Sequence, residues 1–332
     1  MAKVGVLGPT SWGTTLAILT ARNGHDTMMW TRTESEAARL RAAQSNADLL
    51  PGVPFPDNLC VTASSSQAFS DSDLILIAVP SQTFRKNVMA ISTSIDHSAI
   101  VVSATKGIEI DSGKRMSQIL SDELPVSLQS SICALSGPNL ANEIMDGKPS
   151  TTVIGSSNIK AAETAQSLLS SNIFRVYTNE DIVGVEFGGS LKNIIALGAG
   201  VIGGLNYGDN AKAAFITRGL AEMSRLAVKL GADPMTLSGL SGMGDLIVTC
   251  SSKLSRNYYV GEQLATGKNI AEIRSGMKNI AEGIDTTLAT VKLSREAGIE
   301  MPITSITYKV IFDSMPVRQA VSELLGRSPS PE

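Results

Sequence analysis

Polar side chains in the second half of the chain are the ones best suited to acid–base chemistry. Lys192 lies among apolar and small residues, in the stretch from Glu186 to Leu197. Burial disfavours a charged ammonium and lowers its pKa, so such a lysine can exchange a proton near neutral pH. The alternative is a lysine whose ammonium reaches solvent along its aliphatic stem.

Two further segments carry charge in the same half. Asp245 stands alone as a carboxylate in the apolar run 242–250. The triplet Ser255-Arg256-Asn257 stands where a helix is expected to begin, with Ser255 or Asn257 as its cap. A helix N-terminus with an arginine beside it is a favourable site for a phosphate group. The alternatives are a simple cap with an exposed arginine, and an aspartate that pairs with a buried cation.

Glycines are unusually frequent around Lys192. Gly188, Gly189, Gly198 and Gly200 all fall in one predicted helix. Each costs the helix roughly 0.5–1 kcal/mol relative to alanine. Their number predicts close approach of another backbone or of a ligand.

The first half opens with a nucleotide signal. Gly8-Pro9-Thr10-Ser11-Trp12-Gly13 follows a predicted strand and begins a predicted helix. This is the position of the G-x-G-x-x-G turn, in which backbone and helix N-terminus approach a pyrophosphate. Thr10 replaces the middle glycine, and its Cβ would stand where the backbone must come close. Taken alone, the segment is equally compatible with an ordinary tight turn.

Side chains after the next strands extend this signal. At the end of the second strand, Thr31 and Arg32 stand where NAD-selective sites usually carry an acidic residue. Arg32 can pair with the 2′-phosphate of NADP, which favours NADP or dual use, unless it is merely solvated. Lys106 follows another strand, and ligands of open α/β sheets bind beyond such strand ends.

The pattern of elements predicts how these residues are positioned. Val- and Ile-rich runs without polar alternation are typical of strands buried on both faces of a parallel sheet. We expect strands at 3–7, 27–31, 74–79, 100–103, 132–136, 151–154 and 173–177. Helical patterns between them, such as 13–23 and 113–123, indicate a doubly wound α/β domain. The serine-rich patch 64–66 is expected to be a loop.

Beyond residue 178 helical patterns dominate. They cover 181–203, 211–230, 257–264, 281–297, 305–313 and 316–325. We therefore predict an N-terminal nucleotide-binding domain over 1–178 and a mainly helical domain over 179–327. The tail 328–332 is expected to be disordered.

Bulk properties limit the classes of function. The 332 residues are 43% hydrophobic and 18% charged, with a net charge of −3, which disfavours nucleic acid or an anionic membrane as main partner. Cys60, Cys133 and Cys250 show no paired spacing, so we expect neither a disulfide framework nor a metal site. The apolar stretch from Ile194 to Leu205 is below the roughly 18 residues that span a bilayer. A cytoplasmic protein without membrane contact is expected.

Taken together, these segments identify a resemblance. In order and spacing the chain resembles the bacterial-type NAD(P)-dependent glycerol-3-phosphate dehydrogenases over nearly its whole length. The segments that carry it are Ser11-Trp12-Gly13-Thr14, Ser136-Gly137-Pro138, Leu191-Lys192-Asn193, Thr217-Arg218-Gly219-Leu220, Gly244-Asp245-Leu246, Thr249-Cys250, Ser255-Arg256-Asn257, Glu282-Gly283 and Met301-Pro302-Ile303-Thr304.

The resemblance implies a Rossmann-like doubly wound domain followed by a helical domain, as in 6-phosphogluconate dehydrogenase, with the active site between them. It implies NAD or NADP as cofactor, no metal, a phosphorylated triose as substrate, a homodimer, and a role in supplying glycerol phosphate for phospholipid synthesis. It also implies Lys192 as the catalytic proton donor and acceptor.

By matching position, further roles are implied for residues of both halves. The substrate positions are Lys106, Gly137, Asn139, Lys192, Asn193, Asp245, Thr249, Ser255, Arg256 and Asn257. The cofactor positions are Gly8, Thr10, Ser11, Trp12, Gly13, Arg32, Lys106, Ala141, Arg256, Ile280 and Glu282.

Three departures from the family pattern leave alternatives open. Thr10 replaces a glycine, Asn139 stands where Ser or Thr is usual, and Tyr258-Tyr259 stand where basic residues are common. One alternative is a dehydrogenase of the same architecture that acts on a different acid or a CoA ester. Another is a non-catalytic nucleotide-sensing or assembly protein that keeps the fold.

Overall fold

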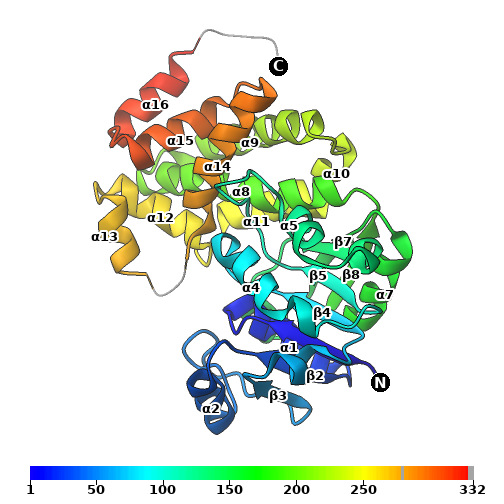
Figure 1. Cartoon of the computed structure of the whole chain (residues 1–332). Helices are drawn as coiled ribbons and strands as arrows, with labels where there is room; N and C mark the ends of the chain where they lie inside the picture. The colour runs from blue at the N-terminus through cyan, green and yellow to red at the C-terminus, as the bar shows by residue number, and fades with distance from the viewer. Residues whose placement is uncertain (278–279, 328–332) are drawn as a thin grey trace.

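The computed structural model describes residues 1–277 and 280–327. It consists of a sheet-based N-terminal part and a helical C-terminal part, with helix α8 (Ile182–Gly204) running between them (Figure 1). The expected disorder of 328–332 falls outside the described residues. The division at 178 and 179 stays a prediction; strand β8 ends at Asn179, close to it.

The N-terminal part is built on one eight-stranded sheet with the order β3-β2-β1-β4-β5-β6-β7-β8. Neighbouring strands are parallel, except that β7 runs antiparallel to β6. The strands are β1 (Lys3–Leu7), β2 (Asp26–Trp30), β3 (Leu59–Thr62), β4 (Leu74–Ile77), β5 (Ile100–Ser103), β6 (Ile132–Ser136), β7 (Ser150–Gly155) and β8 (Phe174–Asn179). The order 3-2-1-4-5-6 is that of the Rossmann fold, so the predicted fold class is confirmed.

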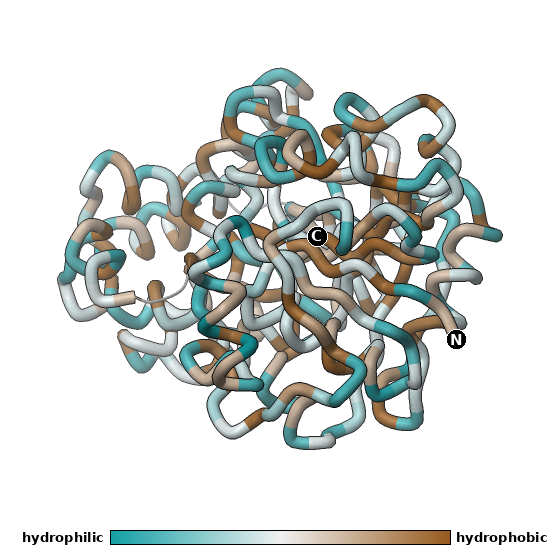
Figure 2. The backbone as a smooth tube through the Cα atoms, turned by 60° about the horizontal axis from the view of Figure 1, so that its bottom comes forward, coloured by the Kyte–Doolittle hydropathy of each residue, from teal (hydrophilic) through white to brown (hydrophobic). Residues whose placement is uncertain are grey.

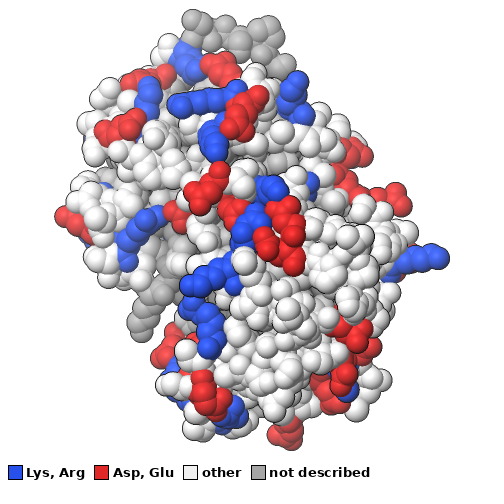
Figure 3. Space-filling view, viewed as in Figure 1, with Lys and Arg blue, Asp and Glu red and all other residues white. Residues whose placement is uncertain are grey.

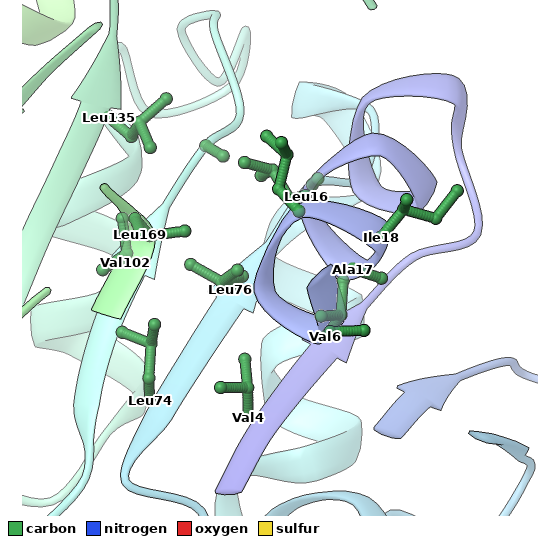
Figure 4. Close-up of a cluster of buried hydrophobic side chains, with 14 of the residues drawn as sticks. Val4, Val6, Leu16, Ala17, Ile18, Leu74, Leu76, Val102, Leu135 and Leu169 are labelled. Carbon is green, nitrogen blue, oxygen red and sulfur yellow. The ribbon is translucent and has the colours of Figure 1, made fainter. Parts of the chain in front are cut away.

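Helices cover both faces of this sheet. The apolar residues that predicted buried strands alternate between the faces, as period-two geometry requires. One face packs on α1 (Ser11–Arg22) and α7 (Ile159–Leu169), where Leu16 and Leu169 meet Val4, Leu76 and Val102 (Figure 4). The other packs on α3 (Ser65–Phe69), α4 (Phe84–Ile91) and α5 (Met116–Glu123). Helices α2 (Glu34–Ala43) and α6 (Ala141–Met145) complete the domain, with 3₁₀ turns at Ser81–Thr83, Ser92–Ser94 and Val126–Ser131.

The helical part is arranged around α8. Its helices are α9 (Gly208–Lys229), α10 (Pro234–Ser238), α11 (Asp245–Ser251), α12 (Arg256–Ala265), α13 (Ile270–Ser275), α14 (Glu282–Ala297), α15 (Pro302–Phe312) and α16 (Val317–Leu325). A π-helical turn at Leu240–Gly244 leads into α11. The predicted close approach at the glycines of α8 is confirmed: a Cβ on Gly200 would lie 2.0 Å from the carbonyl oxygen of Tyr258 in α12.

Helix α8 is long and apolar enough to cross a membrane, which the shorter apolar stretch 194–205 did not suggest. Its 18-residue window has a mean hydropathy of 1.3, yet 83% of that window is buried inside the structure. The hydropathy-coloured trace in Figure 2 shows such apolar segments running through the interior. We therefore interpret α8 as the core helix of this protein.

The structure also corrects one local expectation. The serine-rich patch at 64–66 is not a loop: Ser64 caps α3, and Ser65 and Ser66 form its first turn. Serines favour helix starts as much as loops because their hydroxyls accept from backbone N–H groups.

On the face seen in Figure 3, basic and acidic side chains lie beside one another, as expected for a near-neutral chain.

Candidate active site

Two lysines and one aspartate form a buried charged cluster at the junction of the two parts. Lys192 projects from the middle of α8, Asp245 begins α11, and Lys106 follows β5. Lys106 Nζ donates to Asp245 Oδ2 at 2.6 Å, and Lys192 Nζ donates to Asp245 Oδ1. The side chains of Lys192 and Asp245 are 7% and 1% exposed, so Lys192 does not reach solvent. Asp245 does pair with a buried cation, and that cation is the lysine expected to exchange protons.

The electrostatics of the cluster suit proton exchange. Burial, together with the nearby Lys106 ammonium, lowers the pKa of Lys192 from 10.5 to about 8, although the Asp245 carboxylate opposes the change. A group with such a pKa is populated in both protonation states near neutral pH. The predicted direction of this pKa change is therefore confirmed.

Small residues and hydroxyls hold the cluster in place. Thr249, one turn after Asp245 on α11, accepts from Lys192 Nζ at 2.6 Å and donates to the Asp245 carbonyl oxygen at 2.6 Å. The Gly137 carbonyl oxygen, just beyond β6, accepts from Lys106 Nζ at 3.0 Å. A Cβ on Gly189 would lie 2.3 Å from Ser136 Oγ and 3.4 Å from Lys106 Cγ, so this glycine admits both groups beside α8.

A chain of amides connects the cluster to the N-terminus of α12. Asn257 Nδ2 donates to Asn193 Oδ1 at 2.8 Å, and Asn257 Oδ1 accepts from Gly283 N at 2.9 Å. Asn193 is next to Lys192 in sequence, so α8, α12 and α14 are joined at one point. Of the two candidate caps, Ser255 is the one used: its hydroxyl accepts from Tyr258 N at 3.2 Å.

Arg256 and Glu282 bring a second pair of charges to this region. Arg256, the first residue of α12, is solvent-exposed and lies within electrostatic range of Glu282. Burial raises the pKa of the Glu282 carboxyl, while its bonds to Ser81 and the Arg256 charge act against this rise. Glu282 accepts from the Ser81 backbone N–H at 3.1 Å and from the Ser81 hydroxyl. Since Ser81 follows β4, this contact joins the two parts of the protein.

The turn between β1 and α1 is built on two glycines at which there is no room for a side chain. Gly8 has φ +108°, which favours glycine, and a Cβ there would lie 2.7 Å from Val79 Cγ1. A Cβ on Gly13 would lie 2.0 Å from the Gly8 carbonyl oxygen. Among the described residues, nothing accepts from the N–H groups of Ser11 and Trp12. Free N–H groups at the start of a twelve-residue helix fit an anionic phosphate.

The other predicted cofactor positions lie around the strand ends or at the surface. Arg32 is exposed just after β2, and it makes no ion pair within residues 1–277 and 280–327. Ala141 begins α6, and Ile280 is 48% exposed shortly before α14.

Asn139 is engaged with the protein itself. Its Nδ2 donates to Ser150 Oγ at 3.0 Å and to the Thr151 carbonyl oxygen at 2.8 Å, and its Oδ1 accepts from Thr152 at 2.9 Å. These bonds tie the loop after β6 to β7. In this arrangement the asparagine that departs from the family pattern orders the loop next to Gly137.

No individual role was predicted for Ser81 and Ser136, although Ser136 lies in one of the segments that carry the resemblance. Both are buried, and both follow or end a strand whose carboxyl end faces the site. Ser136 Oγ lies 3.5 Å from Asp245 Oδ2. The rule that ligands bind beyond the carboxyl ends of strands was the available signal, because β4, β5 and β6 supply Ser81, Lys106 and Ser136 in turn.

A separate apolar hollow lies in the helical part. Its volume is about 520 Å³, and α8, α9, α15 and α16 line it with residues that include Leu197, Phe215, Ile306 and Val321. No member of the charged cluster lines it. Within the described chain, no group of three or more His, Cys, Asp or Glu residues is arranged to hold a metal ion.

The fold and the site together define a class of protein. A doubly wound sheet with a glycine-containing turn after β1 is typical of dinucleotide-binding proteins, and a buried lysine of lowered pKa beyond the strand ends is suited to acid–base chemistry. These features define a dinucleotide-dependent oxidoreductase.

Comparison with known proteins defines the family. Residues 3–162 match the family model described as NAD-dependent glycerol-3-phosphate dehydrogenase N-terminus, and residues 181–322 match that of its C-terminus. A glycerol-3-phosphate dehydrogenase [NAD(P)+] of Chlorobium phaeobacteroides is 48% identical over 330 residues, which cover 99% of each chain. One from Dehalococcoides mccartyi is 48% identical over 98% of this chain and 91% of its own length. A crystal structure of glycerol-3-phosphate dehydrogenase from Coxiella burnetii superposes with a TM-score of 0.93 at 34% identity, covering 98% of this chain and 99% of that one. The chain belongs to the NAD-dependent glycerol-3-phosphate dehydrogenase family, as the sequence resemblance predicted.

Proposed function

We propose that this protein interconverts sn-glycerol 3-phosphate and dihydroxyacetone phosphate, with NADP preferred over NAD. The observation that carries the proposed reaction is the buried Lys192–Asp245–Lys106 cluster, joined through Asn193 and Asn257 to the N-terminus of α12. The proposed preference for NADP rests on the exposed Arg32 after β2. Hydrogen bonds thus connect the proposed proton donor to a helix start that is suited to bind a phosphate.

The proton step is assigned to Lys192. When bound, the nicotinamide cofactor supplies or accepts the hydride. In the reductive direction, hydride addition to C2 moves the carbonyl π electrons onto oxygen, and that oxygen takes a proton from Lys192 Nζ. Asp245 and Thr249 orient the ammonium, since both bond to Nζ. Lys106 keeps the region positively charged, which favours the developing alkoxide.

The phosphate group is assigned to the start of α12. Arg256 supplies a charge that is always present, and the first N–H groups of the helix add their partial positive charge. Asn257 and Ser255 hold this helix start in place. Binding energy gained at the phosphate is then available to position C2 against the proton donor.

The remaining expected positions belong to the same proposal. Ser11, Trp12 and the turn from Gly8 to Gly13 would hold the pyrophosphate, and Arg32 the 2′-phosphate of NADP. Ala141, Ile280, Glu282, Lys106 and Arg256 would line the rest of the cofactor site. Gly137, Asn139, Asn193 and Thr249 would line the substrate site.

The biological setting is also a proposal. We expect a cytoplasmic homodimer that supplies glycerol phosphate for phospholipid synthesis, as the family resemblance implies. Light scattering tests the dimer, and rescue of a glycerol-auxotrophic bacterial strain tests the role.

The reaction itself is tested by its product. Reduction of dihydroxyacetone phosphate with NADPH should yield sn-glycerol 3-phosphate. Phosphorus NMR identifies the phosphate ester, and a chiral analysis determines which enantiomer has formed. A product without phosphate, or of the opposite configuration, would contradict the proposal.

A further inference from the structure

Thr10 stands where the dinucleotide turn usually has its middle glycine, and its side chain faces the protein. Its backbone has φ −74° and ψ 169°, an extended conformation that any residue adopts. The Thr10 hydroxyl donates to the Ala78 carbonyl oxygen at 2.7 Å and accepts from the Gly13 N–H at 3.0 Å. One side chain thus caps α1 and ties the turn to the end of β4. These two hydrogen bonds of the Thr10 hydroxyl hold the turn in place.

Asn46 holds the same turn from the opposite side. It is 2% exposed, and its Nδ2 donates to the Pro9 carbonyl oxygen at 2.9 Å and to Thr14 Oγ1 at 2.9 Å. The Asn46 backbone is itself fixed, because its carbonyl oxygen accepts from Leu50 N at 2.8 Å. A buried amide whose two donors are both used is a rigid support.

The hydrogen bonds of these two residues determine which polar groups of the turn remain available to bind a ligand. The Pro9 carbonyl oxygen is occupied by Asn46, and the Thr10 carbonyl oxygen by Thr14 N at 2.8 Å. The Gly13 N–H is occupied by the Thr10 hydroxyl. Within the described part of the chain, the N–H groups of Ser11 and Trp12 remain without an acceptor. Two carbonyl oxygens of the turn are therefore engaged by the protein, while two N–H donors stay available for a phosphate.

We propose that Thr10 and Asn46 are positioning residues that preorganise the turn from Gly8 to Gly13 for the dinucleotide. In this protein threonine is then a better residue at position 10 than the usual glycine. Glycine would lose both hydroxyl bonds and add conformational freedom to a turn that must be ordered to bind. The inference rests on the dinucleotide site of the proposed function.

Direct binding of NADPH and NADH, measured by the change in their fluorescence, tests the inference without any substrate. Thr10→Val removes the hydroxyl but keeps the shape, and Asn46→Ala removes the amide. We expect each to raise the Kd for the dinucleotide about tenfold, as loss of a cap or of a buried hydrogen bond implies. Thr10→Gly should raise the Kd severalfold. Thr10→Ser keeps the hydroxyl, so its Kd should stay within about twofold of that of the unaltered protein.

A matched control separates positioning from general stability. Asn58 also donates through Nδ2 to two backbone carbonyl oxygens, those of Ala21 at 2.8 Å and His25 at 2.9 Å, but at the opposite end of the strands. Asn58→Ala should lower the melting temperature and leave the Kd unchanged. In turnover assays, the Thr10 and Asn46 variants should have a raised KM for the cofactor and an almost unchanged kcat.

Three results would overturn the inference. They are an unchanged Kd in Thr10→Val and Asn46→Ala, a loss in Asn58→Ala as large as in Asn46→Ala, and tighter binding in Thr10→Gly. If the unaltered protein binds neither dinucleotide, the proposed function fails as well. If the unaltered protein binds a dinucleotide and the variants bind it with the same Kd, only the role of Thr10 and Asn46 is contradicted.

Discussion

The Asp245 carboxylate is shared by Lys192 and Lys106, one ammonium on each oxygen. The carboxylate is 1% exposed, so water screens these charges little. Two cations around one anion leave a net positive charge when both lysines are protonated. This excess favours an anionic ligand, and it makes loss of a proton from Lys192 easier than it would be in an isolated ion pair.

Removing the Lys192 ammonium should stop proton transfer while leaving cofactor binding intact. We expect Lys192→Ala to lower kcat by roughly 10²–10⁴-fold, the usual contribution of a positioned acid or base. Lys192→Met keeps most of the side-chain volume and guards against a folding defect, and Lys106 still pairs with Asp245 in both variants. Lys229→Ala, at an exposed position in the last turn of α9, is the control. Turnover of either Lys192 variant near that of the control would remove Lys192 from the catalytic role.

The two directions of the reaction should respond oppositely to pH. Reduction needs protonated Lys192, so its kcat should fall as pH rises through about 8, the lowered pKa of this lysine. Oxidation needs the neutral amine, so its kcat should rise over the same interval. Since the Asp245 charge raises this pKa, Asp245→Asn should move both transitions to lower pH. Profiles of kcat that run in parallel for the two directions would contradict the assignment.

With cofactor saturating, Arg256 should matter most for substrates that carry a phosphate. Hydrogen bonds to charged groups contribute about 1.5–3 kcal/mol, so Arg256→Ala should raise the KM for dihydroxyacetone phosphate roughly 10–150-fold. At saturating cofactor, the slow reduction of unphosphorylated dihydroxyacetone should be nearly unchanged. The control is Arg274→Ala, which removes an exposed arginine that pairs with Asp285 at 2.8 Å. Inorganic phosphate should inhibit the unaltered enzyme competitively, and weak inhibition would favour a dehydrogenase of another substrate class.

Arg32 should set the preference between the two dinucleotides. We expect Arg32→Ala to raise the KM for NADPH about tenfold, because it removes one charge-assisted contact, and to leave the KM for NADH within about twofold. Arg39, an exposed arginine of the same domain that pairs with Asp48, provides the control variant. Equal changes for the two cofactors would show that Arg32 is merely solvated.

Much of the fold could be predicted because local patterns agree with it. The apolar runs of β1, β5 and β6 were placed with their observed bounds, since a strand buried on both faces needs continuous apolar residues. Strand β3 was missed: it has four residues at the edge of the sheet, and Cys60 within it is exposed. The reversed direction of β7 leaves no local trace, because direction depends on how a connection crosses the sheet.

The site was predicted less completely, for a physical reason. The solvent-facing alternative for Lys192 could not be excluded from its neighbours alone, because burial depends on α11 packing against α8. Lys106 and Asp245 are 139 residues apart, and only the packed fold brings them together. Helix α11 itself was not predicted, because Gly242 and Gly244 are unfavourable in a helix and stand just before its start. There a π-helical turn leads into Asp245.

The most direct test of the proposed reaction is to measure NADPH and NADH oxidation with dihydroxyacetone phosphate and then with dihydroxyacetone. We expect rapid turnover only with the phosphorylated ketone, and faster turnover with NADPH than with NADH at low cofactor concentration. Equal rates with both ketones would contradict the phosphate site at α12. No turnover with either cofactor by folded protein would contradict the catalytic assignment, and it would favour a nucleotide-sensing or assembly role instead.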